Sequence, residues 1–190
     1  MMYKRMYTLC EIHGNTDANS QTTLNSEALG SVTIFKYKKG SDNLALHKYT
    51  QQSSQSAQDP DAVAGLAVDG ENTTDYHEAN PAPVGTFHCS HTAIDTPGQW
   101  WMVDLGDMFL VSSILVWGRD DCCWDERIKG LKAAVSVGVT GMQPCGKQFQ
   151  GPTSENPFNF TCKPSLIGRF VKIYREDSMP ISLCEVEIYS

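Results

Sequence analysis

From Asn43 onward, short hydrophobic segments alternate with turn residues. The segments are rich in Val, Ile and aromatic residues, and Gly, Pro, Asn and Asp lie between them, a pattern typical of β-strands and turns. They read WWMVDLG, FLVSSILVWG, KAAVSVGV, RFVKIYR and LCEVEIYS. No part of this region has the period of an amphipathic helix. The pattern predicts an all-β fold, either an antiparallel β-sandwich or a jelly roll.

The last of these segments has the clearest alternation. Cys184, Val186 and Ile188 share one face of the predicted strand, and Glu185 and Glu187 share the other. The pattern alone therefore places the two glutamates on the solvent side of the sheet.

The first part of the chain has a different composition. Residues 14–31 are mostly Asn, Thr, Ser, Gln and Gly, which indicates a linker or disorder, and the segment SVTIFKYKKG after them allows a short edge strand. We predict a polar N-terminal extension over residues 1–41, disordered or a fragment of another unit. A single domain is expected over residues 42–190.

The charge of the chain limits the partners that it can bind. The net charge is −7 and the isoelectric point is near 5.1, whereas nucleic acids and anionic membranes attract a basic surface. No apolar run approaches the length of a membrane span. We therefore expect that the protein does not bind nucleic acid and has no membrane-spanning segment.

The chain has seven cysteines, and all except Cys10 lie after residue 80. This pattern suits three disulfides and one remaining thiol in an oxidising compartment. A zinc site is the rival use, but the spacings show no paired CxxC units. The first residues lack the apolar region of a signal peptide, so we expect a secreted protein whose signal lies outside this sequence. Two N-glycosylation sequons, which begin at Asn72 and Asn159, agree with secretion.

The stretch RDDCCWDER, residues 119–127, carries the most unusual chemistry. Each of its adjacent cysteines has a distant partner, or one is simply buried, or the two form a small strained ring with each other. That ring would be a rigid apolar knob. Arg119 and Arg127 beside it carry forked donors that keep their charge. An apolar surface next to fixed donors suits a sugar, which has C–H faces and hydroxyl groups.

These features resemble one known family. From Asn43 to Ser190 the chain resembles the F-type lectins, or fucolectins. The resemblance rests on NLAL, LAVDG, CSHT, QWWMVDLG, RDDCC followed by ER, GRFVKIY and LCEVEIY, in this order. It implies a galactose-binding-like β-sandwich that is a lectin for terminal L-fucose, with no enzymatic activity.

The resemblance also implies a sugar site. His91, Arg119 and Arg127 would hydrogen-bond the axial hydroxyl and ring region of fucose, and Asp121 completes the motif. The ring formed by Cys122 and Cys123 would pack against the carbon edge of the sugar. Tyr76 is the candidate wall of a small pocket for its methyl group. Two spacings, from His91 to Arg119 and from Asp121 to Arg127, are each one residue longer than is usual in the family.

A structural calcium ion and two further disulfides follow from the same resemblance. Asp69 and Glu185 match the family's carboxylate ligands, and two carboxylates with several carbonyls suit a hard cation. The backbone oxygens that would complete the shell belong to Leu66, Glu71, His88 and Cys184. The further disulfides would be Cys89–Cys184 and Cys145–Cys162, which leaves Cys10 unpaired.

Three classes of function remain to be weighed. The leading interpretation is a calcium-containing lectin for fucosylated glycans or glycoproteins, used in innate immune recognition or cell adhesion. Assembly into homo-oligomers would raise its avidity. The alternative is a galactose-binding-like adhesion module that has lost fucose binding, which the lengthened loop at 119–127 would favour. An enzyme is the least favoured class, because a thiol beside a second thiol would not stay free in an oxidising space.

Overall fold

The computed structural model describes residues 22–28, 31–37, 42–76, 87–121, 127–151 and 156–190. Eight strands and one short 3₁₀ helix lie in this part of the chain. In chain order they are β1 (Thr22–Ala28), β2 (Ser31–Tyr37), β3 (Tyr49–Gln52), η1 (Ala64–Val68), β4 (Trp100–Gly118), β5 (Lys132–Ser136), β6 (Gln143–Cys145), β7 (Phe158–Tyr174) and β8 (Leu183–Tyr189). Within the described residues, no helix has the length and apolar character needed to cross a membrane.

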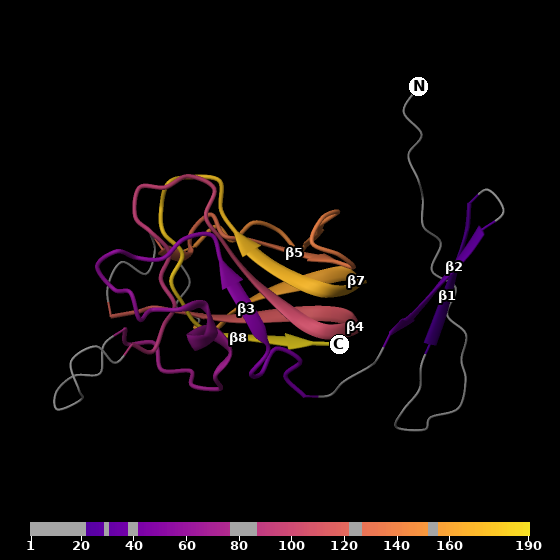
Figure 1. Ribbon diagram of the computed structural model, residues 1–190, viewed down its shortest axis with the longest axis horizontal. Coiled ribbons are helices and arrows are strands. Elements are labelled where there is room, and N and C mark those ends of the chain that lie inside the picture. Colours follow the sequence, from indigo (N-terminus) through magenta and orange to yellow (C-terminus); the bar gives the residue numbers. More distant parts are fainter. Residues whose placement is uncertain (1–21, 29–30, 38–41, 77–86, 122–126, 152–155) are drawn as a thin grey trace.

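Two long strands organise the main sheet (Figure 1). β4 and β7 are antiparallel neighbours, and the sheet continues from β7 to β5 and β6. Along the other edge of β4, β3 pairs with the first half of the strand and β8 with the second half. Every strand pair in the described residues is antiparallel, which confirms the predicted all-β, antiparallel fold.

An irregularity in β4 changes which residues face the core. Trp101 and Val103 point inward in the first half, whereas Ile114 and Val116 point inward in the second, and all four are fully buried. The phase changes where the β4–β7 register shifts, between Val111 and Ser113. Here β4 advances only from Val111 to Ser113 while β7 runs from Leu166 to Thr161, so the extra residues of this irregularity belong to β7. One continuous strand therefore replaces the two separate segments that the sequence pattern shows.

The beginning and end of the predicted domain are tied together by hydrogen bonds. Asn43 Oδ1 accepts hydrogen bonds from Ala45 N at 2.9 Å and from Ile188 N at 3.1 Å. The Cys89–Cys184 disulfide links the loop before β4 to β8, and Cys145–Cys162 links β6 to β7. Both bridges are as expected. The first places the loop that carries His91 next to β8.

The short strands β3 and β6 lack a strong hydrophobic pattern and were not predicted. β2 coincides with the segment that allowed an edge strand, whereas its partner β1 lies in the stretch that was expected to be a linker or disordered. The solvent-side placement of Glu185 is wrong, because this residue is 1% exposed in β8. The domain boundary near residue 42 stays a prediction.

Candidate functional site

His91 is anchored on both sides by backbone hydrogen bonds. Its N–H donates to Ala62 O at 2.9 Å, and its carbonyl accepts from Ser56 N at 3.2 Å and from Gln52 Nε2 at 3.0 Å. The flanking Ser90 and Thr92 pair with the segment that leads into β8. These bonds hold the main chain of His91 in place and so fix the point from which its imidazole projects.

Arg119 is fixed just after the end of β4. Its Nε and Nη2 donate to the two carboxylate oxygens of Asp121 at 2.6 and 2.8 Å. The guanidinium lies 3.9 Å above the centroid of the Tyr76 ring, a cation–π contact. Asp121 Oδ1 also accepts from Tyr76 N at 3.3 Å. These contacts set the orientation of the Arg119 donors before any ligand binds.

Arg127 contacts His91 directly. His91 Nδ1 donates to Thr92 O at 2.6 Å, so its Nε2 carries the lone pair and accepts from Arg127 Nη1. Burial lowers the pKa of His91, and the charges of Arg127 and Arg119 lower it further. The ring of His91 also lies 5.6 Å from the ring of Tyr76. Arg127 therefore binds a neutral histidine directly, and Arg119 lies over the neighbouring ring of Tyr76.

The cluster of His91, Tyr76, Arg119, Asp121 and Arg127 matches the predicted sugar-binding set, apart from Cys122 and Cys123. These two cysteines lie outside the described residues. The side chains of His91 and Tyr76 are each only 2% exposed, so the arginines cover them. The roles predicted for these residues in binding a sugar stay predictions.

Burial and the neighbouring charges change the pKa values of Asp121 and Tyr76 in this cluster. Burial alone would raise the pKa of Asp121, but its hydrogen bonds with Arg119 and the charge of Arg119 outweigh burial and lower it. Burial also raises the pKa of Tyr76, and the nearby Asp59 carboxylate adds to this increase. Asp121 is therefore a stable partner of Arg119 over the physiological range of pH.

The predicted calcium ligands Asp69 and Glu185 come together where η1 ends against β8. Gly70, in the left-handed conformation at φ +90°, lets the chain turn so that its N–H donates to Glu185 Oε2 at 3.3 Å. Burial raises the pKa of Glu185 to about 7, and the charge of Asp69 contributes. Burial also raises the pKa of Asp69. Two carboxylates thus lie where a cation would offset their repulsion.

One atom of this pair supports the fit to a cation. Glu185 Oε1 is buried and has no hydrogen-bond partner in the described part of the chain. A buried carboxylate oxygen left in this way is costly unless an ion or donor satisfies it. The described residues hold no group of three or more His, Cys, Asp or Glu side chains suited to a metal. A cation here would therefore need backbone oxygens as well.

The residues predicted to supply those oxygens lie around the pair. Leu66 belongs to η1, and Glu71 follows the turn, where its N–H donates to Asp69 Oδ1 at 2.9 Å. His88 precedes Cys89, and the disulfide between Cys89 and Cys184 holds that residue next to Cys184. Their exact roles toward a cation stay predictions.

Sequence reasoning missed several residues that support the cluster. Asp59 lies beside Tyr76, and the side chain of Gln52 holds the His91 carbonyl. Both come from polar loop or strand-edge positions with no hydrophobic pattern. A third, Arg175, is 2% exposed and bonds to the backbone of Arg127. Its Arg-x-Asp pattern with Asp177 repeats that of Arg119 and Asp121, and this signal was available in the sequence.

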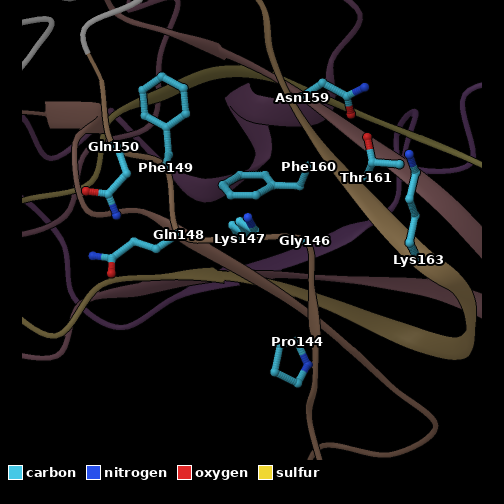
Figure 2. Close-up of a pocket in the computed structure, with 10 residues that line it drawn as sticks. All are labelled: Pro144, Gly146, Lys147, Gln148, Phe149, Gln150, Asn159, Phe160, Thr161 and Lys163. Carbon is cyan, nitrogen blue, oxygen red and sulfur yellow. The ribbon is translucent and has the colours of Figure 1, made fainter.

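A separate pocket of about 560 Å³ lies beside β6 and β7 (Figure 2). It lies between the segment Pro144–Gln150 and β7 residues that include Asn159 and Lys163. None of the residues predicted to bind sugar or calcium lines it. The candidate site is therefore defined by the cluster around His91 and not by this cavity.

Comparisons with known proteins agree with the geometry. Residues 66–173 match the sequence profile of the NedA-like, galactose-binding domain family. Fucolectin-1 of Anguilla japonica is 30% identical over 67% of this chain and 67% of its own length. A fucose-binding module of Streptococcus pneumoniae is 26% identical, with a TM-score of 0.60 over 78% of this chain and 97% of the module.

The fucolectin from the serum of the striped bass, Morone saxatilis, has the same fold, with a TM-score of 0.64 at 23% identity. The match covers 78% of this chain but 48% of the bass protein, so the chain spans about half of that relative. The relatives described here are lectins and binding modules, which supports the prediction that the chain is not an enzyme. The chain belongs to the fucolectin family of F-type lectins and carries its galactose-binding-like domain.

Proposed function

We propose that the chain is a lectin that binds terminal L-fucose at the cluster of His91, Arg119 and Arg127. The contact of Arg127 with the buried imidazole of His91, next to Arg119 on the ring of Tyr76, carries this proposal. Arginine donors match the hydroxyl and ring oxygens of a sugar, and their charge does not depend on pH. The Streptococcus pneumoniae fucose-binding module, which is 26% identical to this chain, supports the same ligand.

The contact between Arg127 and His91 suggests how a sugar hydroxyl would enter. A hydroxyl can donate one hydrogen bond and accept others at the same time. It could therefore donate to His91 Nε2 and accept from Arg127 in place of their direct contact. Arg127 Nε supports this exchange, because it is buried with no hydrogen-bond partner among the residues that the structure describes. Arg119, held by Asp121, would bind without rearranging.

Calcium belongs to the same proposal. Asp69 and Glu185 would supply the carboxylates, with backbone oxygens of Leu66, Glu71, His88 and Cys184. A bound calcium ion supplies positive charge that satisfies the two carboxylates. Asp69 follows η1, and Glu185 belongs to β8. Repulsion between their two carboxylates would therefore lower the stability of the contact between η1 and β8.

The setting of the protein follows from its chemistry. Two disulfides suit an oxidising compartment, and we propose that the protein is secreted. Its partners would be fucosylated glycans or glycoproteins on cell surfaces, met during innate immune recognition or adhesion. Weak single sites would gain avidity if several copies assembled.

Calorimetric titration of L-fucose in calcium tests the function. We expect saturable binding by the native chain. Arg119→Ala is expected to weaken it about 10- to 100-fold, because hydrogen bonds to a charged group contribute about 1.5–3 kcal/mol. Arg169→Ala is the matched control. It removes another arginine paired with an aspartate, Asp104, that has no part in the cluster.

Equal affinity of the native and Arg119→Ala chains would place fucose elsewhere. Absence of binding by a folded native chain would favour the second candidate, an adhesion module that no longer binds fucose. The 2% exposure of His91 is the observation that favours this alternative, since a ligand must first displace Arg127.

A further inference from the structure

Arg175, at the end of β7, is a buried arginine outside the proposed sugar site. It is 2% exposed. Its Nε and Nη2 donate to the two oxygens of Asp177, the second at 2.9 Å. Burying a charge is costly unless it is paired and hydrogen-bonded. Asp177 provides the pairing, and the remaining donors go to the backbone.

The backbone partners of Arg175 belong to two different segments. On one side, Nη1 donates to Arg127 O at 2.9 Å and Nη2 donates to Lys129 O at 3.1 Å. On the other side, Nη1 donates to Pro180 O at 3.1 Å. One planar group therefore joins residues 127–129 to the segment that enters β8.

Each of these segments positions one member of the sugar cluster. The first carries Arg127 itself. The second continues to Ile181, whose N–H donates to Thr92 Oγ1 at 2.8 Å and whose carbonyl accepts from Thr92 N at 3.0 Å. Thr92 is next to His91 and also accepts the hydrogen bond from the ring of His91. The path from Arg175 thus reaches both Arg127 and His91.

We infer that Arg175, paired with Asp177, is a positioning residue that sets the distance between Arg127 and His91 and thereby the affinity for fucose. The effect on affinity rests on the proposed function. A guanidinium suits this role because its donors lie in one rigid plane. A lysine would keep the charge but could not hold three carbonyls and a carboxylate in that geometry.

Arg175→Lys tests the inference through the His91 ring, measured by NMR without any sugar. Burial is the largest cause of the lowered pKa of His91, and the charges of Arg127 and Arg119 add to it, whereas the hydrogen bond to Thr92 and the charge of Asp59 raise the pKa. If Arg175 places Arg127 at the imidazole, Arg175→Lys should raise the pKa of His91. It should have no further effect when Arg127→Ala is already present. A loss of stability alone would not produce this pattern.

Fucose affinity provides the second readout. We expect Arg175→Lys to weaken fucose binding roughly tenfold, as when one hydrogen bond to a charged group is misplaced. The loss should disappear in the Arg127→Ala background and persist in the Arg119→Ala background. Arg169→Lys is the matched control, because its pair with Asp104 does not touch the 127–129 or 180–181 backbone.

An unchanged pKa of His91 and unchanged fucose affinity, with only a lower melting temperature, would overturn the inference. Asp177→Asn replaces Arg175→Lys if the latter does not fold, because it keeps the arginine and loosens its partner. A native chain that fails to bind fucose would overturn the proposed function. The titration of His91 would still decide whether Arg175 positions Arg127.

Discussion

The same three-residue pattern has two uses in this protein. In both Arg119-x-Asp121 and Arg175-x-Asp177, the guanidinium binds the carboxylate two residues later through two nitrogens. The Arg119 pair lies next to Tyr76 at the surface of the cluster, whereas the Arg175 side chain is buried. Local sequence predicts the pairing. The burial that distinguishes the two pairs depends on distant segments.

The proposed calcium site can be tested at the residue scale through Glu185. In calcium-free protein its pKa is raised to about 7, above its unfolded value of 4.5. The raised pKa means that the folded state favours the protonated carboxyl, and this stability is lost as the pH rises through about 7. Calcium binds the ionised form and should offset the loss. We therefore expect the calcium-dependent rise in melting temperature to be larger at pH 8 than at pH 6.

Differential scanning calorimetry with calcium or chelator measures this effect. At a calcium concentration 100 times its Kd, the rise should be roughly 5 to 10 °C. Glu185→Gln, which keeps the size of the side chain, should remove both the rise and its dependence on pH. Melting curves that are identical in calcium and chelator at pH 8 would rule out the calcium site.

At the element scale, the sequence predicted strands well but not their continuity. WWMVDLG and FLVSSILVWG each show the pattern of a strand, yet both belong to β4. The inward-facing positions of β4 shift by one next to the register irregularity between Val111 and Ser113, so no single alternating pattern covers the strand. β3 and β6 are short edge strands of polar or mixed composition, and pairing rather than pattern defines them.

Gly168 allows β5 and β7 to approach closely. A Cβ at this position would lie 2.4 Å from Val135 Cγ1 and 2.7 Å from Ser136 O. Gly168→Ala should therefore destabilise the fold by about 1–3 kcal/mol through overpacking. Urea unfolding measures this change. Gly138→Ala is the control, because a Cβ there meets nothing within 4 Å, and equal stability of the two variants would contradict the packing argument.

At the scale of the whole molecule, the candidate site depends on contacts between distant residues. Tyr76, His91, Arg119 and Arg127 meet because the β4–β8 pairing and the Cys89–Cys184 bridge bring their loops together. No local pattern predicts that meeting, and the resemblance to the fucolectins supplied it. The support from Arg175 and Asp59 was missed, because neither residue belongs to the motifs on which the resemblance rests. The predicted bond between Cys122 and Cys123 lies outside the described residues.

Avidity also belongs to the whole molecule. The match covers 48% of the striped bass fucolectin, about half of that protein. If this chain has a single weak site, assembly into homo-oligomers would let several sites bind one glycan-bearing surface. The oligomeric state stays a proposal.

The central claim is that L-fucose binds at His91, between Arg119 and Arg127. The most direct test is an NMR titration of L-fucose that follows the ring nitrogens of His91, assigned by comparison with His91→Gln. We predict saturable shifts at His91 Nε2 for the native chain, and shifts of Arg119→Ala that need about 10- to 100-fold more fucose to reach the same size. Fucose binding that leaves the His91 ring unchanged, or no binding by the folded native chain, would contradict the account.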